Sequence, residues 1–239
     1  MNARYYNIVT NKGIKSLPSV TTILQVHNQP ALNTWRANLG TELSEQYAEE
    51  TAAIGKEIHR LVAQLIQNVA IPKLEWYQLD QKIKNGIIAY EKFKLEYQFE
   101  PVGAEQIVYS LKHGYAGTLD AYGKILGKWS VIDWKTGWRF FPNMMAQAVA
   151  YYMARKETFN DLSETIYVVN LNREKGVPIV HACKVKDIKP FRNYFLACLR
   201  LFKYAQAIEN IRTVYVDVVA EKSKEKQNAE RSEISSNST

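Results

Sequence analysis

Asp120, Asp133 and Lys135 are the residues of this chain whose types and spacing could do chemistry. Asp133 and Lys135 lie in the segment VIDWKTG, and a separation of two on an extended strand places both side chains on one face. A plain ion pair at a strand end is one interpretation of this pair. Two more Asp-x-Lys triplets begin at Asp80 and Asp187, so the triplet alone predicts little.

The segment before Asp133 distinguishes it from the other two copies. Its pattern predicts a hairpin that turns at Leu126-Gly127, so that paired residues have numbers adding to 253. Asp120 then lies directly opposite Asp133, with Cβ atoms about 5 Å apart. Like charges so placed repel each other, but a divalent cation between them reverses the sign, and Mg²⁺ is commonly held by one or two carboxylates. Lys135 would then polarise a water or stabilise charge that develops on a phosphate.

Composition sets the broad class of protein. A chain of 239 residues with 46% hydrophobic residues can bury the core of one large domain. The two cysteines, Cys183 and Cys198, exclude a four-cysteine iron–sulfur cluster, and we expect both to be reduced. No run approaches the roughly 18 to 20 apolar residues of a membrane span. Because the N-terminus also lacks the features of signal and transit peptides, we expect a cytoplasmic protein without a membrane partner.

The predicted elements favour an α+β fold, in which helices flank a central mixed β-sheet. A hairpin near the start turns at Asn11-Lys12-Gly13, and Ser19 caps a short helix after it. The other segments divide into a helical part and a later, strand-rich part. The helices expected are Ala31 to beyond Trp35, 52–67, 79–97, 143–157 and 191–209, and the strands expected are 105–110, 115–124, 128–133 and two between 164 and 185.

These elements predict one domain over residues 1–219, with a helical N-terminal lobe over about 30–100 and a sheet-containing core over 101–219. Residues 220–239 are polar and predict a disordered tail. The tail carries four Lys/Arg and four Glu, so the net charge of +7 belongs to the rest of the chain. A basic folded surface favours a polyanionic partner such as nucleic acid.

Asp120, followed thirteen residues later by Asp133-Trp134-Lys135, resembles the D…(D/E)-x-K signature of the PD-(D/E)XK nuclease superfamily. Further motifs resemble those of its RecB-type branch, which includes single-domain phage exonucleases and mitochondrial genome-maintenance exonucleases. These motifs are PSVTTIL, IGKEIH, GYAGTLD and QAVAY. They lie between about residue 18 and residue 152, in the order that they have in that branch. The resemblance implies a restriction-endonuclease-like core and a metal-dependent deoxyribonuclease that uses Mg²⁺ or Mn²⁺.

The resemblance also implies roles for single residues. His59, from IGKEIH, joins Asp120 and Asp133 as a metal ligand, although a lone histidine beside Ile58 is by itself more typical of a core position. Water activated by the metal and by Lys135 then attacks the phosphodiester.

Gln147 and Tyr151 are four residues apart and share a helix face. The resemblance assigns Gln147 to ordering Lys135 or the attacking water, and Tyr151 to contact with DNA.

The residues around these motifs leave alternatives open. Thr136 follows the lysine, where backbone amides could approach a phosphate, or a plain turn could lie there. Arg139, between Trp138 and Phe140, is expected to contact DNA. Glu105, on the strand before Asp120, is either a carboxylate close to the metal or an ordinary edge-strand glutamate.

The expected function is that of a DNA exonuclease that acts from single-stranded ends in recombination, repair or replication. The resemblance to phage exonucleases also suggests a phage or prophage origin. The chain lacks a G-x-x-x-x-G-K-[ST] phosphate loop, so we expect no ATP cofactor. A recombination protein or a single-strand-binding protein is a further expected partner. The alternatives are a structure-specific endonuclease and a catalytically silent DNA-binding recombination partner.

Overall fold

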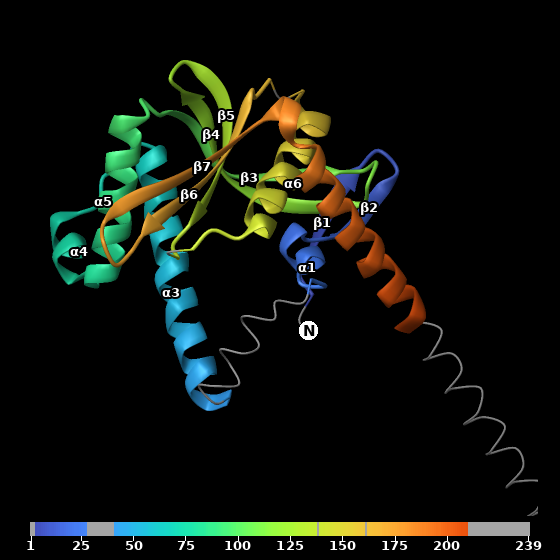
Figure 1. Ribbon diagram of the computed structural model, residues 1–239, viewed down its shortest axis with the longest axis horizontal. Coiled ribbons are helices and arrows are strands. Elements are labelled where there is room, and N and C mark those ends of the chain that lie inside the picture. The colour runs from blue at the N-terminus through green and yellow to red at the C-terminus, as the bar shows by residue number, and fades with distance from the viewer. Residues whose placement is uncertain (1–2, 28–40, 138, 161, 210–239) are drawn as a thin grey trace, which may run out of the picture. The chain divides into compact units, whose positions relative to one another are not determined.

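The computed structural model describes residues 3–27, 41–137, 139–160 and 162–209 (Figure 1). The chain divides into two units, Met1–Leu196 and Ala197–Thr239, and the elements labelled in Figure 1 belong to the first. The helix expected to begin at Ala31 and the tail expected over 220–239 lie outside the described residues. None of the described helices combines the length and the apolar character needed to cross a membrane.

The first unit contains the predicted strands and helices in the predicted order, with one short additional helix over Lys73–Gln78 that the sequence analysis did not predict. The strands are β1 (Tyr5–Thr10), β2 (Gly13–Pro18), β3 (Glu100–Ser110), β4 (Tyr115–Ile125), β5 (Lys128–Lys135), β6 (Thr165–Asn172) and β7 (Val177–Lys184). The helices are α1 (Val20–Leu24), α3 (Thr41–Ile66), α4 (Lys73–Gln78), α5 (Gln81–Glu96) and α6 (Pro142–Phe159), with a 3₁₀ turn, η1, at Val185–Asp187. Residues 189–196, at the end of this unit, are helical, and in the second unit residues 197–209 are helical.

β3 to β7 form a single mixed sheet in the order β3-β4-β5-β6-β7 (Figure 1). β5 and β6 are parallel, and the other neighbouring strands are antiparallel. A parallel pair needs a long crossover, and α6 supplies it between β5 and β6. The α+β class with a central mixed sheet and flanking helices is therefore confirmed.

The β4–β5 hairpin has the predicted turn and register. Leu126 and Gly127 have φ angles of 49° and 76°, and a two-residue type I′ turn requires positive values at both positions. The backbone pairs all have numbers adding to 253, as far as the pair of Ala121 with Ile132. That pair is the last one before Asp120 and Asp133. Backbone pairing between the two strands therefore ends where the two carboxylates lie.

Trp134 lies at the centre of the hydrophobic core on one face of the sheet. Its ring packs against Tyr90, Phe93 and Phe99, with centroid distances between 5.5 and 6.1 Å. The same core contains buried apolar residues of α3, α5 and β6, among them Ile58, Leu61, Ile87, Val169 and Leu171. Because side chains alternate along β5, burying Trp134 on this face directs its neighbours Asp133 and Lys135 to the other.

Two predicted boundaries are wrong. α3 begins at Thr41, eleven residues before the predicted start. The prediction missed this first part of the helix because residues 42–50 are mostly exposed and show little of the apolar spacing on which it depended. β3 begins at Glu100 rather than residue 105, and its register shifts between Pro101 and Gly103. Pro and Gly are depleted in strands, so a strand through this irregularity is not apparent from sequence.

The hairpin and the capped helix near the N-terminus are confirmed. β1 and β2 pair antiparallel across a turn at Asn11-Lys12. The Ser19 hydroxyl accepts a hydrogen bond from the Thr22 N–H at 3.0 Å, as an N-cap should.

The close approach of β4 to β3 at Gly123 generates a stability prediction. A methyl group at Gly123 would collide with the backbone carbonyl oxygen of Glu100. We expect Gly123→Ala to lower the free energy of unfolding, measured by urea denaturation, by about 1–3 kcal/mol. Gly137→Ala is the control, because a Cβ there meets nothing within 4 Å. An equal loss of stability in both variants would contradict the prediction.

Candidate metal centre and active site

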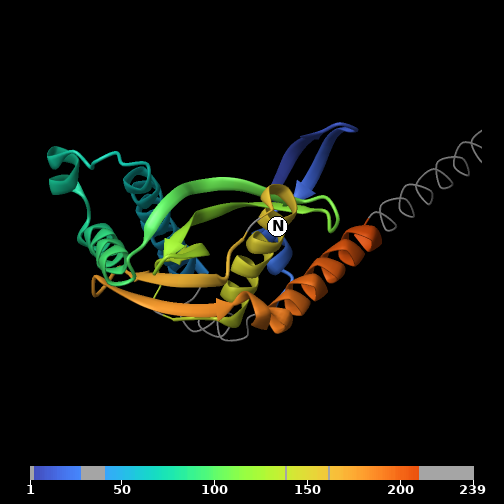
Figure 2. The ribbon, with the colours of Figure 1, turned by 90° about the horizontal axis from the view of Figure 1, so that it is seen from above.

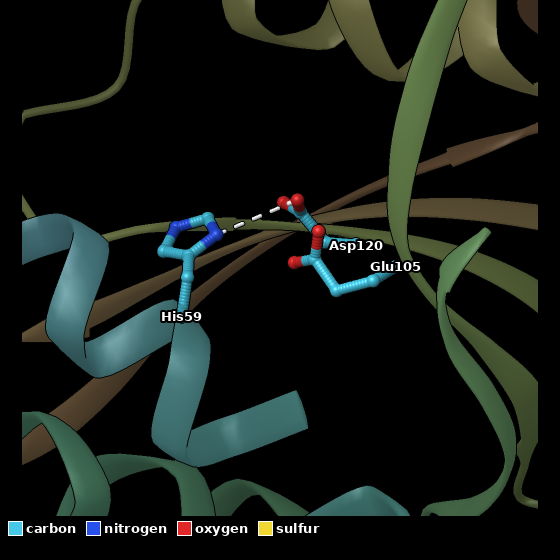
Figure 3. Close-up of side chains that lie close together, drawn as sticks. All are labelled: His59, Glu105 and Asp120. Atoms are coloured by element: carbon cyan, nitrogen blue, oxygen red, sulfur yellow. Dashed lines mark ion pairs between the residues drawn. The ribbon is translucent and has the colours of Figure 1, made fainter. Parts of the chain in front are cut away.

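His59, Glu105 and Asp120 bring possible metal-ligand atoms together from three elements (Figure 3). They lie on α3, β3 and β4, and one ligand atom of each residue lies within 4.8 Å of those of the other two. His59 Nδ1 is 3.4 Å from Asp120 Oδ1. Two carboxylates suit Mg²⁺ or Mn²⁺, and an imidazole suits Mn²⁺ better than Mg²⁺. The cluster differs from the expected set in containing Glu105 in place of Asp133.

Glu105 joins this cluster at an irregular point of β3. The β3–β4 register places it opposite Asp120, between the paired residues Ala104 and Gln106. Its φ of 51° lies in the left-handed region, which costs a residue other than glycine about 1–3 kcal/mol. Such strain is frequent at functional sites. Of the two open interpretations of Glu105, its position favours the carboxylate close to a metal, and no local sequence signal distinguished them.

The Asp120 carboxylate connects β4 to β5 beyond the last backbone pair. Its Oδ2 accepts a hydrogen bond from the backbone N–H of Trp134 at 2.8 Å. Burial alone would raise the pKa of Asp120, but the charges of His59 and Lys135 and the two hydrogen bonds outweigh burial and lower the pKa below its ordinary value. Asp120 is therefore held as a carboxylate, the form that binds a cation.

Asp133 is fully buried and pairs with Lys135. Asp133 Oδ2 lies 2.5 Å from Lys135 Nζ, so the plain ion pair predicted from their spacing is present. Burial raises the pKa of Asp133 to about 6, with Lys135 opposing the rise and the negative charge of Asp120 adding to it. The pKa values of the two carboxyl groups are thus shifted in opposite directions, so Asp120 is the stronger acid and Asp133 the weaker.

Gln147 of α6 connects the lysine to the carboxylate. Its Oε1 accepts a hydrogen bond from Lys135 Nζ at 3.2 Å, and its Nε2 donates to Asp133 Oδ1 at 3.2 Å and to the Tyr151 hydroxyl at 3.0 Å. One amide group thereby orients the two charged groups. This geometry supports the role of ordering Lys135, while an effect on the attacking water stays a prediction.

Tyr151 is buried, with 4% of its surface exposed. Its ring lies so close to Gly117 of β4 that a methyl group at Gly117 would collide with it. Burial and the negative charge of Asp133 raise the pKa of Tyr151 well above its ordinary value, so its hydroxyl stays protonated. In this structure Tyr151 supports Gln147, and its expected contact with DNA stays a prediction.

Thr136 lies against α3, one helical turn from His59. A Cβ atom built on Gly55 would come within 3.0 Å of the Thr136 hydroxyl oxygen, so glycine at this position leaves room for the hydroxyl. Thr136 is thus brought to the side of the site that carries His59, and its contact with a phosphate stays a prediction.

The aromatic and basic segment after Thr136 is partly committed to contacts within the protein. Arg139 is exposed, and its guanidinium carbon lies 5.7 Å from the centre of the Phe141 ring. Phe140 stacks on His181 at 4.1 Å, while Trp138 lies outside the described residues. The DNA contact expected of Arg139 stays a prediction.

The other two Asp-x-Lys triplets have different surroundings. The Asp80 carboxylate caps α5 by accepting the Lys82 N–H at 2.7 Å, and Asp187 lies in η1. In the part of the chain that the structure describes, neither belongs to a cluster of possible metal ligands. Only the triplet at Asp133 faces a carboxylate on a neighbouring strand.

Asn170 is a polar residue beside the site that the sequence analysis missed. It is the partner of Lys135 in the parallel β5–β6 register, so both side chains lie on one face. Asn170 is fully buried, and neither its amide oxygen nor its amide nitrogen has a hydrogen-bond partner among the described residues. A buried polar group without a partner costs about 1–3 kcal/mol. An asparagine inside an apolar strand was the signal that could have identified it.

No protein-family model matches this sequence, and no curated protein matches it either. Arguments about function therefore depend on the site itself.

The protonation of the site generates a prediction for metal binding. The pKa values of His59 and Glu105 are raised and that of Asp133 is about 6, so protons compete with a cation as the pH falls toward 5. We expect Mn²⁺ to raise the midpoint of thermal unfolding by several degrees at about pH 8 and by much less at about pH 5.5. Asp120→Asn should remove the shift and Asp187→Asn should retain it. A shift independent of pH, or one that survives Asp120→Asn, contradicts this prediction.

Asn170 generates a second prediction. Replacing its unpaired amide by an apolar side chain of similar size should raise the free energy of unfolding of Asn170→Leu by about 1–3 kcal/mol, measured in urea. Asn172 is the matched control on the same strand, because its Oδ1 accepts the N–H groups of Glu174 and Lys175 at 3.0 Å each. Asn172→Leu should therefore destabilise the protein. Equal destabilisation by both substitutions would show that the Asn170 amide is satisfied.

Proposed function

We propose that this protein is a metal-dependent DNA exonuclease of the PD-(D/E)XK superfamily, similar to its RecB-type branch. The observation that carries the proposal is the convergence of Asp120, Asp133 and Lys135 where β4 and β5 separate. Asp133 is buried and Asp120 is half-buried, so their like charges on neighbouring strands oppose stability, and a bound cation would offset that repulsion. A possible ligand set lies beside them, and an amide orients the lysine.

The donor set fits a divalent cation. Asp120, Glu105 and His59 would hold it, and Asp133 lies on the neighbouring strand. Mg²⁺ or Mn²⁺ at such a site supplies Lewis-acid stabilisation of charge on the phosphate and lowers the pKa of bound water.

The residues of the chain have separate tasks in this proposal. Lys135 offers its ammonium hydrogens to the attacking water or to a phosphate oxygen, and Gln147 directs that ammonium group. Tyr151, packed on Gly117, holds Gln147 in place. Tyr151 is buried, and Lys135 and Gln147 are half-buried, and this partial exclusion of water strengthens each of these electrostatic interactions.

The proposed substrate is DNA with a single-stranded end. The net charge of +7 favours a polyanion, and the preference for a strand end comes from the resemblance to the RecB-type exonucleases. In this proposal the protein digests strands during recombination, repair or replication, and it acts in the cytoplasm of a bacterial or phage-infected cell. A recombination protein or a single-strand-binding protein is the further partner we propose.

Two alternatives make different predictions. A structure-specific endonuclease would nick closed plasmid circles, whereas an exonuclease leaves them intact. A catalytically silent DNA-binding protein would need no ordered lysine, yet Lys135 is bound by both Asp133 and Gln147.

Digestion of end-labelled single strands tests the proposed function. Strands labelled at the 5′ or the 3′ end should be shortened with Mg²⁺ or Mn²⁺ and left intact in EDTA. Lys135→Ala should lower the rate by roughly 10²- to 10³-fold, because it removes a positively charged donor that stabilises developing charge on the phosphate. Lys189→Ala, in another Asp-x-Lys triplet, is the matched control and should digest at the wild-type rate. If the wild type shifts both strands on a gel but shortens neither, the catalytic proposal fails.

A further inference from the structure

The β1–β2 hairpin carries positive charge close to the candidate site. Residues 3–27 include Arg4, Lys12 and Lys15 and no Asp or Glu, and the first acidic residue of the chain is Glu42. The hairpin stands out from the five-stranded sheet in Figure 2. Its base contacts β4 through the small cluster of Ile8, Leu17 and Ala116. A segment with positive and no negative side chains thus packs against the strand that carries Asp120.

The backbone of Arg4 is held on both sides by the first residues of α1. The Arg4 N–H donates to the Thr22 hydroxyl oxygen at 3.0 Å, and the Arg4 carbonyl accepts the Ser19 N–H at 2.8 Å. Ser19 also forms a β-bridge with Ala116 of β4. The segment PSVTTIL, which carried part of the family resemblance without a chemical role, therefore fixes the start of β1 against β4.

Tyr6 orients the Arg4 side chain and connects it to β4. The Arg4 guanidinium carbon lies 4.8 Å from the centre of the Tyr6 ring, within the range of a cation–π contact. The Tyr6 hydroxyl forms a hydrogen bond of 2.9 Å with the hydroxyl of Thr118. Thr118 and Asp120 are two residues apart on β4, so they share a face of the strand. The contact places the Arg4–Tyr6 pair beside the metal-ligand cluster.

Within the part of the chain that the structure describes, the Tyr6 hydroxyl is committed to Thr118, whereas the Arg4 guanidinium has no hydrogen-bond acceptor. Its side chain contacts the Tyr6 ring, and its positive charge opposes the rise in the pKa of Glu105 that burial and Asp120 cause. Guanidinium groups bind phosphate through two parallel N–H···O bonds, and stacking on a ring leaves those N–H groups available at the edge.

We propose that Arg4, oriented by Tyr6, binds a phosphate of the nucleic-acid strand next to the one that is cleaved. This inference depends on the proposed function for the identity of the strand. The phosphate belongs either to the sugar-phosphate backbone or to the end of the strand, and both present the same anionic oxygens. Arg4 is a binding residue here, because it lies outside the group that contacts the reacting phosphate.

Binding without cleavage tests the assignment. The probe is a fluorescein-labelled oligothymidine of about 20 nucleotides, measured by anisotropy with the full chain in EDTA at several salt concentrations. Arg4→Gln should weaken binding roughly tenfold or more and reduce the salt slope by about 0.7, the value for one phosphate contact on a single strand. Lys73→Gln on α4 removes the same charge from an exposed position and should change neither quantity. Equal affinities for Arg4→Gln and Lys73→Gln would overturn the inference.

Variants of Tyr6 separate orientation from folding. Tyr6→Phe keeps the ring and should bind within about twofold of the wild type, whereas Tyr6→Leu removes the ring and should weaken binding several-fold. Thermal unfolding of each variant identifies any that fail to fold. If Tyr6→Phe binds as weakly as a folded Tyr6→Leu, the ring does not orient Arg4 and that part of the inference is wrong. Strands with and without terminal phosphates distinguish a terminal phosphate from a backbone phosphate as the group that Arg4 binds. If Arg4→Gln binds both kinds of strand more weakly than the wild type does, Arg4 binds a backbone phosphate.

The inference and the proposed function fail in different ways. Digestion by the wild type together with unchanged binding by Arg4→Gln retains the nuclease and rejects the phosphate site. Binding that Arg4→Gln weakens, without any digestion by the wild type, retains the phosphate site and rejects the nuclease. A wild type that neither binds nor digests rejects both. An effect of Arg4→Gln on Mn²⁺ affinity alone would show that Arg4 only offsets the charge of the carboxylates.

Discussion

The hydrogen bond from the Trp134 backbone N–H to the Asp120 carboxylate is the contact on which the arrangement of this site depends. Backbone pairing between β4 and β5 ends at Ala121 and Ile132. Beyond this pair, the side chain of Asp120 on β4 forms the hydrogen bond to the backbone of β5. A carboxylate that accepts a backbone N–H is kept ionised and in place. The strands can therefore separate at this point without losing their alignment, and Asp133 and Lys135 lie on the face of the sheet that Gln147 contacts.

Trp134 also determines which residues face each other. Its ring is buried among aromatic residues on one face of the sheet, so alternation directs Asp133 and Lys135 to the face that Gln147 of α6 reaches. α3 packs on the Trp134 face and still supplies His59 where β4 and β5 separate. A site built in this way receives side chains from helices on both faces, while the rigid sheet holds its carboxylates.

Features that cost stability are concentrated in this region. Glu105 has a left-handed backbone, Asp133 is a buried acid with a raised pKa, and Asn170 is buried without a partner. Selection for stability alone would remove each of them, and strained or unsatisfied groups that gather at one place are typical of functional sites. The region of Arg4 and Tyr6 adds a positive group next to them, as a site for a polyanion requires.

The sequence by itself determined the features that depend on neighbouring residues: the turn at Leu126-Gly127, the register that follows from it, the Ser19 cap and the facing carboxylates Asp120 and Asp133. Each comes from short-range geometry, because alternation and turn type operate over a few residues. His59, Gln147 and Tyr151 came from resemblance to a family, since a helix face does not state what it will contact. Only the tertiary structure decided that Glu105 lies with His59, that Asn170 lies beside Lys135 and that Arg4 lies beside the site. Those positions depend on an irregular strand, on the order of strands in the sheet and on the packing of a distant hairpin, and no local pattern encodes these long-range contacts.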